Sequence, residues 1–210
     1  MKVVESAIAL GADGPNRHYI PESEDVIASM QQLADQHGSD VRLVAPGGYS
    51  PVDMDPRRVR RIVRNFLGNA IEHGEGRPIV VTVDSDQHAV ALGVRDFGLG
   101  MRAEDVDRVF DRFWRADPSR TRTIGGTGLG LSIALGDARL HGGELAVWSE
   151  PGRGSHFVLT LPRLPGETVT SSPIPVEAGD DQSPAMDALG LTQPIDLPIA
   201  SGADAMGERS

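Results

Sequence analysis

The sequence predicts a domain that combines α-helices with mostly antiparallel β-strands, and three patterns carry this prediction. Residues 56–73 place apolar side chains three and four positions apart, as on the buried face of an amphipathic helix. Residues 79–83 and 89–94 alternate apolar and polar side chains on either side of a polar turn, which is typical of two antiparallel strands. Residues 145–149 and 157–161 show a second hairpin of the same kind.

The first half of the chain adds a helix and a strand before these patterns. Apolar residues at helical spacing predict an amphipathic helix over residues 25–38, and residues 41–45 predict a short strand. Asp55 is a favourable N-cap for the helix at 56–73, and Pro56 suits its first position. The second half adds a short helix at 104–109.

A further helix is predicted to begin at Gly128 and to end at Gly142–Gly143. Leu131, Ala134, Leu135 and Ala138 are expected on its inner face. The preceding stretch, residues 115–127, has no periodicity and many small polar residues, which favours a mobile loop.

Composition divides the 210 residues into three parts. Residues 1–21 are interpreted as an N-terminal remnant or linker, and residues 22–163 as the folded domain. Residues 164–210 hold eight acidic residues, one arginine and six prolines, so we expect a disordered acidic tail. The net charge of −10 disfavours nonspecific nucleic-acid binding. No apolar run of about 18 residues occurs, so no membrane segment is expected in this chain.

Two glycine clusters bracket an arginine-rich segment. The first is Asp96-Phe97-Gly98-Leu99-Gly100, and the second runs from Gly125 to Leu131 into a helix. Glycine lets backbone N–H groups approach oxyanions, and a helix N-terminus favours negative charge. Each cluster alone is equally compatible with a tight loop, but the pair favours a phosphate ligand. No P-loop is present, because no lysine followed by serine or threonine closes either cluster. Arginines 112, 115, 120 and 122 lie between the clusters.

Asn65, Asn69 and His73 form a polar stripe beside the apolar face of the helix at 56–73. Asparagine is a poor residue for the middle of a helix, because its amide competes for backbone partners. The stripe therefore suggests a ligand contact, although a pair of surface or internally satisfied asparagines would give the same pattern.

The order and spacing of four sequence motifs resemble those of one protein family. The helix with Asn-x-x-x-Asn, the Asp-x-Gly-x-Gly turn, the Phe-rich segment 110–115 and the Gly-x-Gly-Leu-Gly-Leu helix start are similar to the ATP-binding catalytic domain of bacterial sensor histidine kinases. The resemblance covers residues 25–163, and the wording from Arg112 to Arg120 looks most like actinobacterial Mtr-type kinases. It implies a two-layer α/β sandwich (α+β, the Bergerat or GHKL fold), with helices on one face of a mixed, mostly antiparallel sheet.

The resemblance also implies an ATP·Mg²⁺ site. Asp96 would accept a hydrogen bond from the adenine amino group, while Gly98 and Gly100 make room for the ring. Asn69, assisted by Asn65, would bind Mg²⁺ through amide oxygens, the ligand type this ion prefers. Phe110 and Phe113 would anchor the lid. The ATP-binding set implied is Asn65, Asn69, His73, Asp96, Gly98, Gly100, Phe110, Gly126, Thr127, Gly128, Leu129, Gly130 and Leu131. The catalytic set implied is Asn65, Arg112 and Arg115, with Arg120 and Arg122 as further lid charges.

Two features depart from the family pattern. Glu72 stands where many of these kinases place a lysine, so the lid arginines would carry that charge. The usual phosphoacceptor histidine, followed by an acid on a dimerising hairpin, is not found in this chain, and His18 does not fit it. The acceptor would then be a dimerisation domain of a sensor kinase, with a response regulator as the later partner and a cytoplasmic location. A non-catalytic ATP-dependent binding module and an anti-sigma-type serine kinase are the alternatives.

Overall fold

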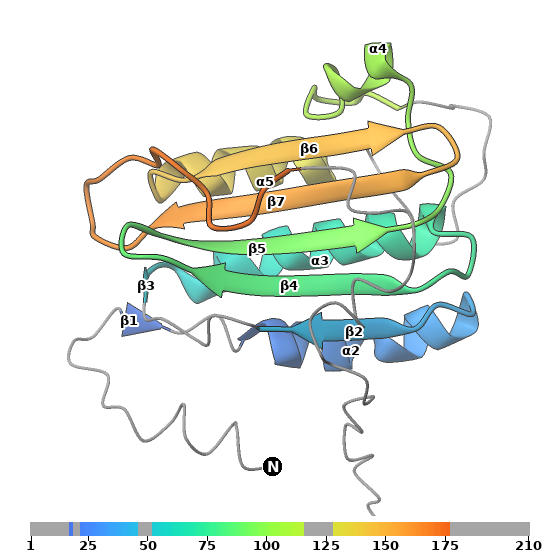
Figure 1. Cartoon of the computed structure of the whole chain (residues 1–210), viewed down its shortest axis with the longest axis horizontal. Coiled ribbons are helices and arrows are strands. Elements are labelled where there is room, and N and C mark those ends of the chain that lie inside the picture. The colour runs from blue at the N-terminus through green and yellow to red at the C-terminus, as the bar shows by residue number, and fades with distance from the viewer. Residues whose placement is uncertain (1–16, 19–21, 46–51, 116–127, 177–210) are drawn as a thin grey trace, which may run out of the picture.

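The computed structural model describes residues 17–18, 22–45, 52–115 and 128–176, with residues 17–18 and 22–25 described by their backbone alone. A five-stranded sheet forms one layer, and three helices lie behind it as a second layer (Figure 1). These helices are α2 (Glu22–Gln36), α3 (Pro56–His73) and α5 (Gly130–Leu140). The short helix α4 (Ala103–Val106) lies at one end, beyond the sheet. This arrangement confirms the predicted two-layer fold.

The sheet is mixed and mostly antiparallel, as predicted. Its strand order is β2-β4-β5-β7-β6, and only the β2–β4 pair is parallel among the described strands. The bounds are β2 Val41–Val44, β4 Ile79–Ser85, β5 Ala89–Asp96, β6 Glu144–Glu150 and β7 Gly154–Pro162. All five predicted strands are present, and the last four are longer than predicted. An unpredicted pair joins β1 (Arg17–His18) to β3 (Val52–Asp53).

Helix α3 forms the centre of the helical layer. The Asp55 carboxylate accepts hydrogen bonds from the backbone N–H groups of Arg57 (2.9 Å) and Arg58 (3.4 Å), which confirms the predicted cap. The apolar stripe of the helix is buried against the sheet, where the rings of Phe66 and Phe157 lie 5.3 Å apart. The stripe thus fixes which face of α3 meets the sheet, and the polar residues beside it lie at the edge of the core. No helix in the described parts of the chain is both long and apolar enough to cross a bilayer.

Successive side chains of β5 point to opposite faces of the sheet, and this alternation decides which of them face the helical layer. Leu92 and Val94 belong to the core between sheet and helices, so Asp96, two residues on, lies on the same face. Gly93 and Arg95 lie on the opposite, outer face. Asp96 is therefore placed at the end of the central strand, facing the helical layer.

The chain after Arg163 differs from its prediction over residues 164–176. This segment runs back across the outer face of the sheet (Figure 1), and Ile174 is only 5% exposed, packed against Ala91 and Val158. The Thr160 hydroxyl donates to Ser172 Oγ at 2.9 Å. The prediction of an unpacked tail from 164 is wrong here, because Ile174 packs on the outer face of the sheet beside Gly93, where an added Cβ would lie 3.5 Å from Ile174 Cγ2. Residues 177–210 lie outside the described residues.

Candidate functional site

Asp96 is a buried carboxyl group at the end of β5. The residue is 3% exposed, and its Oδ1 accepts a hydrogen bond from the backbone N–H of Gly98 at 3.0 Å. Burial raises the pKa of Asp96 to about 6, although the Gly98 N–H and the charge of Arg95 favour the ionised form. A buried acceptor of this kind can recognise a ligand by accepting a hydrogen bond from a donor group on it.

The turn after Asp96 is pressed between two other pieces of backbone. A Cβ on Gly98 would lie 2.0 Å from the carbonyl oxygen of His73, at the end of α3, and Leu99 N–H donates to that same oxygen at 3.0 Å. Gly100 has φ of +63°, and its Cβ would lie 1.8 Å from the carbonyl oxygen of Glu150. Both glycines are therefore required by close backbone approach, and their predicted role of making room for a ring stays a prediction.

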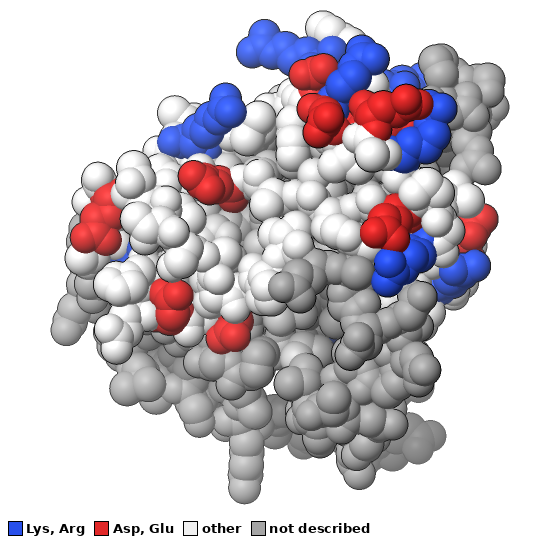
Figure 2. Space-filling view, turned by 45° about the horizontal axis from the view of Figure 1, so that its top comes forward, with Lys and Arg blue, Asp and Glu red and all other residues white. Residues whose placement is uncertain are grey.

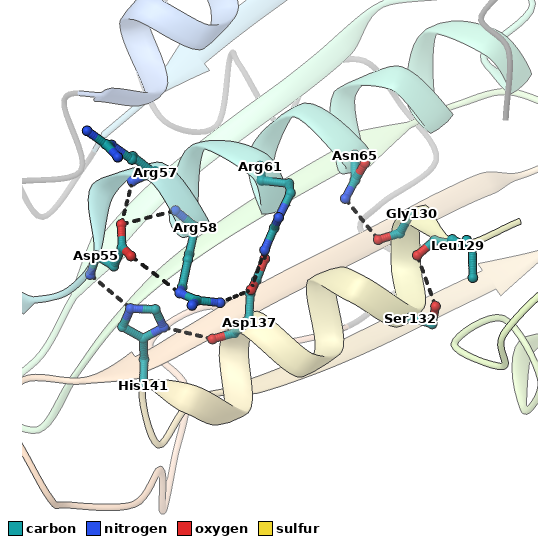
Figure 3. Close-up of polar contacts among 10 residues, drawn as sticks. All are labelled: Asp55, Arg57, Arg58, Arg61, Asn65, Leu129, Gly130, Ser132, Asp137 and His141. Atoms are coloured by element: carbon teal, nitrogen blue, oxygen red, sulfur yellow. Dashed lines mark hydrogen bonds and ion pairs between the residues drawn. The ribbon is translucent and has the colours of Figure 1, made fainter. Parts of the chain in front are cut away.

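Asn65 links α3 to the start of α5. Its Nδ2 donates to the carbonyl oxygen of Gly130 at 2.8 Å, as Figure 3 shows. This bond assigns the amide orientation, so Oδ1 is the atom that can contact a cation. A Cβ on Gly130 would lie 3.1 Å from Oδ1, so a larger residue there would press on the amide. Asn69 and His73 follow one and two turns along α3, both half-buried.

The start of α5 has no side-chain cap among the described residues. Leu129 stands at the N-cap and has no side chain that could bond the first-turn N–H groups. Gly128 just before it has φ of +72°, in the left-handed region that favours glycine. Ser132 Oγ donates to the carbonyl oxygen of Leu129 at 2.9 Å (Figure 3), and Leu131 packs against the core. The uncapped N-terminus of an eleven-residue helix can attract an anion.

The aromatic residues before the loop behave differently from each other. Phe110 packs edge-on against Phe157, with ring centroids 6.5 Å apart; its roles in anchoring the lid and binding ATP stay predictions. Phe113 is 72% exposed, so its ring is not packed into the described core, and its role as a lid anchor stays a prediction. Its main-chain N–H donates to the Gly128 carbonyl oxygen at 2.9 Å. Phe113 has a positive φ of +62°, which is unusual for a residue other than glycine. Arg112 is exposed and Arg115 is half-buried.

Some of the predicted site lies outside the described residues, namely Gly126, Thr127, Arg120 and Arg122. The remaining residues fall into two groups. Asn65 meets Gly130 halfway along α3, whereas Asp96 and Gly98 lie at the His73 end of that helix. The polar stripe between these two groups spans about 12 Å, at 1.5 Å of rise per residue.

Two buried side chains beside this site were not predicted. Asp137 in α5 is bound by Arg58 and Arg61 of α3 (Figure 3). Arg95 lies on the outer face, with its guanidinium 4.6 Å from the Phe97 ring centroid and 4.7 Å from that of Trp148. It donates to the carbonyl oxygen of Asp96 and supports the site from behind. A charged residue within an apolar helix or strand was the available signal for both.

Charged side chains on the face shown in Figure 2 gather most densely around α4. There Arg102 pairs with Glu104 at 2.8 Å and with Asp105 at 3.0 Å, and Arg108 lies 3.7 Å from Asp111. Pairs of this kind are exposed and contribute little to stability. The outer face of the sheet is mostly uncharged in this view.

Comparison with known proteins connects this geometry to a family. Residues 54–165 match the family model described as "Histidine kinase-, DNA gyrase B-, and HSP90-like ATPase". The chain is 45% identical over 162 residues to the sensor histidine kinase MtrB of Mycolicibacterium paratuberculosis, a match that covers 77% of this chain and 29% of the relative. It is 42% identical over 129 residues to the histidine-protein kinase AfsQ2 of Streptomyces coelicolor, covering 61% and 24%. The chain thus spans less than a third of these curated relatives.

Solved structures share the fold. The mycobacterial sensor histidine kinase MprB matches with a TM-score of 0.57 and 25% identity, covering 71% of this chain and 97% of that chain. The catalytic domain of histidine kinase ThkA matches with a TM-score of 0.59 and 23% identity, covering 68% and 92%. The second likeness concerns the fold alone. The predicted resemblance to this family, including its Mtr-type branch, is confirmed.

Proposed function

The chain belongs to the family of histidine kinase-, DNA gyrase B- and HSP90-like ATPases, and we propose that it binds ATP and Mg²⁺ as the catalytic domain of a sensor histidine kinase. The γ-phosphoryl group of ATP would pass to a histidine on a dimerisation domain. A response regulator would receive the group afterwards, and the site of action would be cytoplasmic. These partners and this location are proposals that rest on the similarity to sensor kinases.

The observation that carries the proposal is the arrangement along α3. At one end of its polar stripe lies a buried carboxyl, Asp96, that suits the amino group of a base. Near the middle of the helix lies the uncapped N-terminus of α5, which suits phosphate. Asn65 lies at the start of α5, Asn69 follows one turn closer to Asp96, and both offer amide oxygens. A ligand with an aminated base at one end and phosphates at the other matches this order, as ATP does.

Each residue then has a role that follows from its chemistry. Asp96 in its ionised form accepts from the adenine amino group, a contact that guanine cannot make in the same way because it carries an oxygen there. Mg²⁺ would supply charge neutralisation for the phosphates when bound, held by Asn69 and Asn65. The N–H groups after Gly128 would hold phosphate oxygens. Arg112 and Arg115 lie at the start of the lid and would neutralise charge that develops during transfer.

Asn65 also bears on the fate of the phosphoryl group. Its amide cannot take a proton from water as a carboxylate can, so this position does not favour hydrolysis by an activated water. Its bond to Gly130 shows a second use, which is to tie α3 to the phosphate end of α5. Glu72, half-buried near the end of α3, adds no positive charge to the site, so that charge must come from the arginines.

Transfer to an added acceptor tests the proposal. The chain is mixed with an isolated dimerisation hairpin from an Mtr-type kinase and with ATP labelled at the γ-position. Acid-labile phosphohistidine should appear on the hairpin, and Asn69→Ala should abolish it. Asp40→Asn is the matched control, because Asp40 is exposed and pairs only with nearby Arg42 on the described surface. If ATP binds tightly but no phosphohistidine forms, the kinase proposal is contradicted and the alternative of a non-catalytic ATP-dependent binding module is favoured.

A further inference from the structure

We propose that Asp137 is a positioning residue that holds the phosphate-binding end of α5 in register with α3. The inference rests on the proposed function, since it concerns how the same site is kept in shape. Asp137 lies two turns along α5 from Gly130 and touches none of the residues proposed to contact ATP in the described contacts. Its effect would pass through the helix.

The carboxylate of Asp137 is buried and bound on both oxygens. Its side chain is 3% exposed. Arg61 Nε donates to Oδ2 at 2.7 Å and Arg61 Nη2 to Oδ1 at 2.7 Å, while Arg58 Nη1 donates to Oδ1 at 3.0 Å. A two-pronged arginine pair of this kind has a narrow geometry. It therefore specifies one position of α5 along α3.

The same interface carries two more polar contacts, one at each side of Asp137 (Figure 3). Toward the start of α5, Asn65 Nδ2 donates to Gly130. Toward its end, the His141 ring joins both helices, because Nε2 accepts from Asp55 N–H at 2.9 Å and Nδ1 lies 2.7 Å from the Asp137 carbonyl oxygen. The contacts follow one another in antiparallel order along the two helices. They form a row of polar contacts between the two helices, and the contact at one end of this row, Asn65 to Gly130, lies at the proposed phosphate site.

The apolar part of this interface is poorly suited to fix the register. The fully buried apolar residues that α5 offers to the core are Ala134 and Ala138, each with a single methyl group, and only half-buried Leu131 adds a larger apolar side chain to this cluster. Small smooth side chains allow neighbouring helices to approach, but they interlock little. The Asp137 carboxylate is buried, whereas the side chains of Arg58 and Arg61 are 42% and 49% exposed. Burying this charge costs desolvation energy, so the contribution that we assign to the contact is one of geometry rather than of net stability.

A shift of α5 would reach the proposed site directly. The Gly130 carbonyl would leave Asn65 Nδ2, and the amide would then be free to rotate its oxygen away from the position expected for Mg²⁺. The adenine end would be unaffected, because Asp96 and Gly98 are held by β5 and by the end of α3. The inference thus predicts a defect that depends on phosphates.

Binding of ATP and of adenosine, compared by calorimetry in the presence of Mg²⁺, tests this. Asp137→Asn removes the charge at nearly constant shape, and Arg61→Lys keeps the charge but loses the two-pronged geometry. Each should bind ATP about tenfold more weakly, the effect of roughly one hydrogen bond, with adenosine affinity unchanged. Ile174→Ala is the control for lost stability, because Ile174 packs on the opposite face of the sheet. It should bind both ligands as the wild type does.

The outcomes separate this inference from the proposed function. If Arg61→Lys and Asp137→Asn bind ATP as tightly as the wild type, the inference is overturned while the ATP site stands. An equal loss of ATP and adenosine affinity would also overturn it, because that pattern reports general damage. If Asp137→Asn does not fold, the Arg61→Lys result decides alone. A wild type that binds no ATP would overturn both proposals together.

Discussion

Replacing Asp96 by asparagine should stabilise the nucleotide-free protein at neutral pH. The carboxyl is buried at the end of β5, and burial raises its pKa from 3.8 to about 6. The Gly98 N–H and the charge of Arg95 oppose that rise without cancelling it. Asparagine has a similar shape and keeps an acceptor oxygen for Gly98, yet it has no charge to desolvate. The substitution therefore removes a cost and keeps a hydrogen bond.

The size and sign follow from proton linkage. A pKa rise of about 2 units corresponds to about 3 kcal/mol. The pKa of Asp96 is 3.8 in the unfolded chain and about 6 in the folded protein, so the folded state binds more protons between these two pH values. The stability of the protonated form is complete below about pH 4 and is lost as pH rises through about 6. Asp96→Asn should then gain about 3 kcal/mol at about pH 7.5 and only about 1 kcal/mol at about pH 4.5.

Urea unfolding at the two pH values measures this difference. The exposed Asp40→Asn variant serves as control and should change the free energy of unfolding by less than about 0.5 kcal/mol at both. The reasoning is refuted if Asp96→Asn destabilises the protein at neutral pH. It is also refuted if the gain is the same at both pH values, because the burial of charge would then not be its cause.

ATP affinity should fall as pH drops through about 6, the raised pKa of Asp96, because protonation removes the acceptor for the adenine amino group. ATP titrations between about pH 5 and 8 measure this fall, and the Asp96→Asn variant should not show it. Gly98→Ala should cost about 3 kcal/mol in urea unfolding, because its Cβ meets the His73 carbonyl oxygen. Gly68→Ala in open space on α3 should instead gain up to about 1 kcal/mol. Ile174→Ala should cost about 2 kcal/mol, and exposed Leu164→Ala almost nothing.

Each of these has a clear opposite result. An unchanged ATP affinity from neutral to acidic pH would remove Asp96 from the base contact. Equal stability of the two glycine variants would mean that the turn after Asp96 can move away from α3. An Ile174→Ala variant as stable as Leu164→Ala would mean that residues 164–176 do not hold to the sheet in solution.

Local patterns were sufficient for most of the fold. The buried stripe of α3, its Asp55 cap and the alternation in β4 and β5 are all local in sequence, so each could be recognised without the structure. The family resemblance then implied that these elements form two layers. It also selected Asn65 and Asp96, whose contacts with ATP and Mg²⁺ stay predictions; in the structure Asn65 bonds to Gly130 and Asp96 is a buried carboxyl.

What could not be predicted depends on contacts between distant segments. Asp137 is one charged residue in a helix, and only the packing of α5 on α3 shows that two arginines enclose it. Ile174 lies in a stretch too poor in apolar residues to predict packing, and its partner surface exists only once β5 and β7 have paired. Phe113 is exposed while its backbone N–H bonds to the Gly128 carbonyl oxygen, and no local side-chain pattern reveals that bond.

Calorimetric titration of the wild-type chain with ATP and with GTP, each with and without Mg²⁺, tests the central claim most directly. We expect ATP to bind, Mg²⁺ to strengthen its binding, and GTP to bind at least tenfold more weakly, because guanine offers Asp96 an oxygen where adenine offers a donor. Equal binding of ATP and GTP, or no binding of either, would contradict the claim that this fold holds an adenine-reading nucleotide site.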